Sequence, residues 1–179
     1  MTISLATPAD FAAILALQDQ NHLRHLPEDA RGDGFLTTYL EAPKLEFLIA
    51  RRGLFVAKSK GELAGYACAE SWDLSGEREF HLRVASQFPF FVGGREINAQ
   101  NSLLYGPVCV AAPFRGRGVL GALIEAFQAE FCARFSFGVT FIDYLNARSL
   151  AAHERKLGFR IVGELPYDDT IYHVLAFFL

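Results

Sequence analysis

A turn rich in glycine and arginine, lying between an apolar run and a helical pattern, carries the residues best suited to chemistry. The run Val108–Val110 favours a strand, and the turn after it reads Arg115-Gly116-Arg117-Gly118. Glycines here would let a phosphate approach the backbone, and the first amides of a helix have no intrahelical acceptor. The arginines add charge that can be aimed at phosphate oxygens. The stretch therefore predicts a phosphate site, although such a turn can also serve only to reverse the chain.

The spacing of the glycines sets this turn apart from two familiar phosphate motifs. Gly118 is not followed by the Lys-Ser or Lys-Thr pair of a Walker loop. The glycines also lack the spacing of a dinucleotide fingerprint, and the preceding strand lies late in the chain instead of opening a βαβ unit.

The elements that must position the turn follow from hydrophobic periodicity and from turn residues. A capping-box pattern at Thr7-Pro8-Ala9-Asp10 starts the first helix. We expect strands over residues 1–6, 54–58, 63–72, 102–110, 139–144, 160–165 and 170–179, and further helices over residues 43–52, 78–91, 119–135 and 147–156. Residues 21–34 are polar and irregular, and they form either a mobile segment near a site or a surface connection.

Gly106-Pro107 interrupts a run that otherwise predicts a central strand. Proline cannot donate to a strand ladder, so it is confined to edges and bulges. A bulge or local splay at this point would resolve the conflict. It would also open a gap beside the strand in which an extended ligand could pair with the backbone.

Length and composition restrict the class of protein. The chain has 179 residues, so we expect one domain over 1–179 with a substantial core. A hydrophobic fraction of 51% excludes disorder, and a net charge of -3 gives no indication of a nucleic-acid partner. No signal peptide and no membrane-spanning run is evident. Cys68, Cys109 and Cys132 lie in apolar runs without CxxC spacing, which predicts buried, reduced thiols in a cytoplasmic protein.

A second motif, together with the glycine turn, resembles the GNAT superfamily of acyl-CoA-dependent N-acyltransferases. The first family motif, Arg/Gln-x-x-Gly-x-Gly/Ala, corresponds to Arg115-Gly116-Arg117-Gly118-Val119-Leu120, and the second to Asn146, Ser149, His153 and Gly158-Phe159. Two departures stand out. Leu120 occupies the last small position of the first motif, with Gly121 directly after it, and one extra residue separates His153 from Gly158.

The resemblance covers the whole chain and implies an α/β (α+β) fold of the GNAT type. Its sheet would be mixed, mostly antiparallel, splayed at the central strands after Tyr105 and flanked by helices. It also implies acetyl-CoA as cosubstrate, no metal, and contacts to CoA from Val108, Cys109, Val110, Arg115, Gly116, Arg117, Gly118, Val119, Leu120, Gly121, Asn146 and Ser149.

The resemblance gives His153 the role of protonating the departing thiolate, a proton transfer suited to a histidine. Alternatively, Asn146 is only a helix N-cap and His153 an ordinary helix histidine. Glu70, at the end of an otherwise apolar strand, is the best candidate for the base that deprotonates the amine, and Tyr105 is the alternative. Trp72, Phe80 and His81 could line an acceptor pocket, although aromatic residues in such numbers more often form a core.

Three function classes follow. The first is transfer of an acetyl group to a primary amine of a small molecule or peptide. The second is a non-catalytic acyl-CoA-binding module, and the third is a phosphate-ligand binder outside the family.

The apolar strand Tyr172–Leu179 must be covered by the protein's own elements or by a second subunit, so we expect a monomer or homodimer with no nucleic acid or membrane partner.

Overall fold

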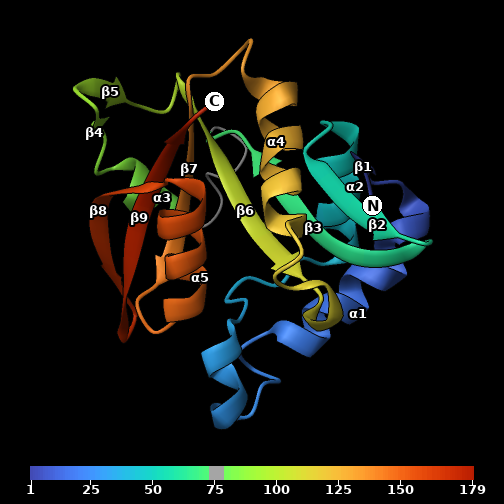
Figure 1. Ribbon diagram of the computed structural model, residues 1–179. Coiled ribbons are helices and arrows are strands. Elements are labelled where there is room, and N and C mark those ends of the chain that lie inside the picture. Colours follow the sequence, from blue (N-terminus) through green and yellow to red (C-terminus); the bar gives the residue numbers. More distant parts are fainter. Residues whose placement is uncertain (73–78) are drawn as a thin grey trace. The chain divides into compact units, whose positions relative to one another are not determined.

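The computed structural model describes residues 1–72 and 79–179. Its helices are α1 Phe11–Asn21, α2 Ala42–Ala50, α3 Glu79–Ala85, α4 Val119–Phe131 and α5 Ala147–Ala151, and its strands are β1 Thr2–Leu5, β2 Leu54–Ser59, β3 Glu62–Glu70, β4 Phe90–Val92, β5 Arg95–Ile97, β6 Ser102–Val110, β7 Phe137–Asp143, β8 Arg160–Tyr167 and β9 Thr170–Phe178. Seven strands hydrogen-bond in the order β1-β2-β3-β6-β7-β9-β8, and β4 and β5 form a separate hairpin (Figure 1). The β6–β7 pair is parallel, whereas β1–β2, β2–β3, β7–β9 and β8–β9 are antiparallel. The predicted mixed, mostly antiparallel sheet with flanking helices is confirmed.

Two compact units divide the chain, and each combines two stretches of sequence. The first unit comprises Met1–Ala69 and Gly106–Glu130, and the second comprises Glu70–Tyr105 and Phe131–Leu179. Strand β6 contributes residues to both units.

In the first unit, strand alternation sends side chains to two covered faces. Leu54 and Val56 of β2 share a core with Tyr66 of β3 and with apolar side chains of α1 and α2. Phe55, which alternation turns the other way, meets Phe127 of α4 with ring centroids 6.4 Å apart. Helices α1 and α2 therefore cover one face of these strands and α4 the other (Figure 1).

In the second unit, a core forms between the sheet and the segments that precede β6. It joins Val84 of α3 and Phe90 of β4 to Leu104 of β6 and Val174 of β9. Trp72 also lies in this core and donates its indole N–H to the Ser102 hydroxyl at 3.0 Å. For Trp72, the structure therefore favours the core alternative over the acceptor pocket.

The predicted splay lies on β6. Its parallel ladder with β7 runs from Ser102–Phe137 to Leu104–Val139 and, among the described residues, goes no further. Gly106 then takes a positive φ of 117°, and the peptide bond to Pro107 is cis. The ladder thus stops just before the residue pair that the sequence singles out.

Helix α4 ends earlier than its hydrophobic period predicts. We expected it to reach residue 135, but it stops at Phe131 and a turn follows, closed by a hydrogen bond from the Arg134 amide to the Phe131 carbonyl. The reason is tertiary, because Ser136 already donates its amide to the Asn101 carbonyl at the entry to β7. Cys132 lies in this turn and is exposed, so the prediction that it is buried is wrong.

The predicted helix over residues 78–91 is also too long. Arg78 lies outside the described residues, and α3 ends at Ala85. The residue before a proline disfavours the helical region, so Pro89 prevents continuation. Phe90–Val92 instead forms β4, which Gly93 and Gly94 connect to β5 with positive φ at both positions.

The apolar C-terminal strand is covered, as predicted. β9 lies between β7 and β8, and Val174–Phe177 are buried. This cover comes from the chain itself, and a second subunit stays a prediction. None of the described helices is both long and apolar enough to cross a membrane.

Gly65 sets the close approach of β3 to the end of β6, and this makes it sensitive to substitution. A Cβ at Gly65 would lie 2.7 Å from the Cys109 carbonyl oxygen, which is backbone and cannot swing aside. We expect Gly65→Ala to lower the free energy of unfolding by about 1–3 kcal/mol, as overpacking does. Gly32→Ala is the matched control, because nothing lies within 4 Å of its added Cβ. Equal urea midpoints for the two variants would contradict this reading.

Candidate active site

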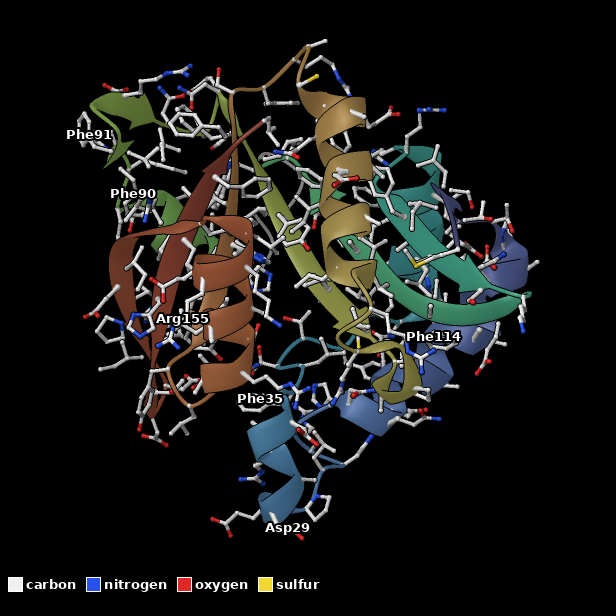
Figure 2. All side chains as sticks on the ribbon, viewed as in Figure 1. Asp29, Phe35, Phe90, Phe91, Phe114 and Arg155 are labelled. Atoms are coloured by element: carbon white, nitrogen blue, oxygen red, sulfur yellow. The ribbon has the colours of Figure 1, made fainter. Side chains whose placement is uncertain are left out.

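The glycine turn places two glycines of positive φ directly before the start of α4. A 3-10 turn, Ala112–Phe114, leads into it, and α4 begins directly after it (Figure 2 labels Phe114). Gly116 and Gly118 have φ of 75° and 80°, values that other residues rarely adopt. The Ala122 amide donates to the Gly118 carbonyl at 3.1 Å, so the amides of the three residues before Ala122 precede the helical ladder.

Open space lies in front of both glycines. A Cβ built on Gly116 or Gly118 meets nothing within 4 Å, and both residues are exposed. Packing therefore does not explain the glycines, whereas backbone conformation and access to the amides do. The turn fits a pyrophosphate group, held by these amides and by the positive end of the α4 dipole.

The Arg115 side chain does not have the orientation that the sequence suggested. Its guanidinium donates to the Val110 carbonyl at 3.1 Å, to the Asp33 carbonyl at 3.1 Å and to Oδ1 of Asn21 at 2.6 Å. The Arg115 amide also donates to the Ala112 carbonyl at 3.3 Å. The charge of Arg115 is thus engaged within the protein, and Arg117, which is exposed, is the remaining arginine of the turn.

Cys109, at the end of β6, contributes no nucleophile. Burial raises the pKa of its thiol to about 12, and the nearby Arg115 charge offsets this only in part. Because the thiolate is the reactive form, this thiol is inert at neutral pH. Any role of Val108–Val110 toward a ligand therefore falls to their backbone groups.

The helix that carries His153 changes from α to π geometry. After α5, the segment Ala152–Lys156 is a π-helix, and it ends at Leu157. A π turn accommodates one residue more than an α turn. This accounts for the extra residue between His153 and Gly158, and Gly158 then leaves the helix with φ of 73°.

His153 is held in one tautomer by the turn before it. Its Nδ1 lies 2.8 Å from the Ser149 carbonyl oxygen, which can only accept, so Nδ1 carries the proton. The Ser149 hydroxyl lies 3.5 Å from the same nitrogen. Nε2, buried and without a hydrogen-bond partner in the described part of the chain, bears the lone pair of the neutral ring.

Burial lowers the pKa of His153, and the hydrogen bond to Ser149 opposes this shift without cancelling it. The side chain is only 3% exposed, which agrees with burial as the main cause. The imidazole is therefore neutral near pH 7, with Nε2 as an acceptor. Before it can give a proton, it must first take one.

Tyr105 and His153, two of the predicted catalytic residues, lie together in an aromatic cluster. Their ring centroids are 6.0 Å apart in edge contact. Phe159 lies 5.9 Å from Tyr105 and 5.1 Å from His153, and Phe177 stacks on Phe159 at 4.1 Å. Strand alternation explains the grouping, because Tyr105 and Phe177 point away from the core face that Leu104 occupies.

Asn146, the N-cap of α5 three residues after β7, and Glu70, at the end of β3, both lie in the second unit. Asn146 is buried, and although its backbone caps α5, its side chain makes no capping hydrogen bond. The N-cap alternative therefore does not account for the asparagine side chain. Glu70 is the last residue of β3 and is half-buried.

Asn21 and Asp33 contact Arg115 of the turn, and both lie in residues 21–34, for which the sequence left a segment near a site as one alternative without indicating these two residues. Asn21 is the last residue of α1 and is buried, and Asp33 contributes its backbone carbonyl. Their relation to Arg115 spans 94 and 82 positions of sequence, so it required the three-dimensional structure.

Comparison with solved structures places the fold. It is similar to an N-acetyltransferase from Staphylococcus aureus Mu50, with 19% identity, TM-score 0.67 and coverage of 99% of this chain and 97% of the other. It is similar to a ribosomal-protein-alanine N-acetyltransferase from Brucella melitensis, with 22% identity, TM-score 0.62 and full coverage of both chains. The third is yncA, a putative acetyltransferase from Salmonella typhimurium solved with acetyl-CoA, with 19% identity, TM-score 0.63 and coverage of 99% and 92%.

Sequence comparison identifies the family. A search of curated protein sequences gave no match. The family model for the Acetyltransferase (GNAT) family matches residues 20–159, which includes the glycine turn and the His153 helix. The chain therefore belongs to the GNAT acetyltransferase family.

Proposed function

We propose that the protein transfers an acetyl group from acetyl-CoA to a primary amine of a small molecule or peptide. The observation that carries this proposal is the turn before α4, in which Gly116 and Gly118 have positive φ and open space around them. Family membership and a fold neighbour solved with acetyl-CoA support it. The free thiols of the chain fit the reducing, cytoplasmic setting that we propose for it.

Acetyl-CoA, when bound, supplies an acyl group activated as a thioester whose thiol departs. Amides of Gly116 through Gly121 hold the pyrophosphate, and Arg117 adds charge. Backbone groups of Val108–Val110 pair with the pantetheine arm, one of their amides polarises the carbonyl oxygen, and Asn146 holds the same arm. Direct attack by the amine is favoured over an acyl-enzyme route because the Cys109 thiol stays protonated.

Two residues divide the proton transfers in this proposal. Glu70 takes the proton that an ammonium group carries, so that a neutral amine attacks. Nε2 of His153 then accepts the proton that the nitrogen loses on forming the amide bond and gives it to the departing sulfur. This order of proton transfers agrees with an imidazole that is neutral near pH 7. Tyr105, which packs against His153, is the alternative to Glu70 as the base.

An amine panel with acetyl-CoA and mass-spectrometric detection tests the activity. The panel contains amino acids, polyamines, aminoglycosides and a peptide with N-terminal alanine, since one fold neighbour is a ribosomal-protein-alanine N-acetyltransferase. Acetylated product with release of thiol supports an enzyme. Tight CoA binding without product from any amine would instead support the non-catalytic acyl-CoA-binding module.

The phosphate-binding turn gives a first prediction for this function. We expect Gly118→Val to abolish CoA binding in calorimetry, because a side chain there would occupy the open space before the amides. Gly94→Val is the matched control, since Gly94 has φ of 75° and open space but lies in the β4–β5 turn. Both variants carry the same kind of backbone strain, about 1–3 kcal/mol. If the Kd of Gly118→Val for CoA lay within a few-fold of that of Gly94→Val, the glycine turn would not be the pyrophosphate site.

The proton roles give a second prediction, read from pH–rate profiles. We expect His153→Gln to lower kcat by about tenfold to a hundredfold, the low end for general acid–base catalysis because a thiol leaves readily. Since burial lowers the pKa of His153, the neutral ring persists through neutral pH, and any loss of the wild-type rate from protonation of His153 should appear only at acidic pH. The His153→Gln defect should therefore persist at high pH.

Glu70→Gln should behave differently in the same measurement. Its defect should be largest on the acidic side and shrink as pH rises, because the amine then loses its proton without help. If both variants keep the parental kcat across the range, proximity alone accounts for the rate and neither residue is catalytic.

A further inference from the structure

The Arg115 guanidinium gathers three acceptors from three separate segments of the first unit. They are the Val110 carbonyl at the end of β6, the Asp33 carbonyl, and the Oδ1 atom of Asn21 at the end of α1. A planar guanidinium offers donors in a fixed fork, which an ammonium group cannot reproduce. The side chain is therefore matched in shape to this set of oxygens.

The Asn21 acceptor is held in place independently of Arg115. Asn21 is buried, and its Nδ2 donates to the Leu17 carbonyl at 2.8 Å, which fixes the side-chain amide with Oδ1 toward the guanidinium. Its backbone carbonyl accepts from the Leu36 amide at 2.8 Å, and the Leu36 carbonyl accepts from the Leu23 amide at 2.9 Å. These bonds close residues 21–36 at their base.

Residues 21–36, which we call the polar segment, are thus attached to the glycine turn at two points. Asn21 lies at the start of the segment and Asp33 near its end, and Arg115 contacts both. Between these points the segment is mostly exposed, with Asp29 at its tip and Phe35 near its base (Figure 2). A surface connection alone would not need a charged residue of the glycine turn to tie its two ends.

We propose that Arg115 is a positioning residue that couples the glycine turn to the polar segment, so that CoA on the turn amides restricts the motion of residues 21–36. This rests on the proposed function only in that CoA occupies the turn. CoA binding restricts the backbone of Gly116–Gly118 and, with it, the adjacent backbone from which the Arg115 side chain extends. An amine substrate that contacts residues 21–36 then binds more tightly to the CoA-bound protein than to the free protein, because coupling between two sites is reciprocal.

Amide hydrogen exchange of the full chain, with and without saturating CoA, tests the coupling. In the wild type we expect CoA to slow exchange in residues 21–36 by about tenfold, within the usual range of coupling between sites. In Arg115→Lys and Arg115→Gln, CoA should still slow exchange at the glycine turn but not in residues 21–36. Arg117→Gln is the matched control: it should weaken CoA binding, yet keep the protection of residues 21–36 at saturation.

The lysine variant separates positioning from a direct charge on phosphate. A phosphate contact would survive in Arg115→Lys, whereas a fork-shaped tie would not. Protection of residues 21–36 retained in Arg115→Lys and lost in Arg115→Gln would therefore overturn the proposal. So would wild-type protein that binds CoA without slower exchange in residues 21–36. Failure of the wild type to bind CoA would count against the proposed function itself.

Discussion

In the described part of the chain, the ladder between β6 and β7 ends at Leu104, and the Gly106-Pro107 interruption of β6 follows one residue later. Pro107 has no amide hydrogen to offer a neighbouring strand, and Gly106 takes a positive φ of 117°. Tyr105, at the last position before the break, packs into the aromatic cluster with His153. The residues after the break run to Val110, whose carbonyl anchors Arg115. The interruption thus lies between the residue that packs against His153 and the residue whose carbonyl accepts from Arg115.

The tautomer and the protonation state of His153 are set by the residues around it. The Ser149 carbonyl selects the tautomer, the π turn absorbs the added residue, and Phe159 and Tyr105 exclude water from the ring. A histidine in this position is a neutral acceptor that can pass a proton along. An exposed histidine on the same helix would titrate with solvent and would have no fixed tautomer.

Local signals in the sequence predicted much of the fold and the position of the glycine turn before α4. The hairpin of β2 and β3, the capping box at Thr7 and the break at Gly106-Pro107 each depend on a few adjacent residues, so they could be recognised directly. The end of α4 could not, because its hydrophobic period continues and the pairing with Asn101 that stops it is distant in sequence. The orientation of the Arg115 side chain could not be predicted for the same reason. Its positive charge suggests a phosphate partner, whereas the guanidinium donates to three oxygens from segments that are distant in sequence.

Neither compact unit is a continuous piece of chain. The polypeptide passes from one unit to the other between Ala69 and Glu70, between Tyr105 and Gly106, and between Glu130 and Phe131. No single cut can therefore separate the glycine turn from the His153 helix and leave two whole units. A truncation that keeps the whole of one unit therefore also keeps part of the other, and a single recombination crossover cannot exchange one unit while leaving the other intact. The glycine turn and the His153 helix must therefore be produced as parts of one chain if both units are to be whole.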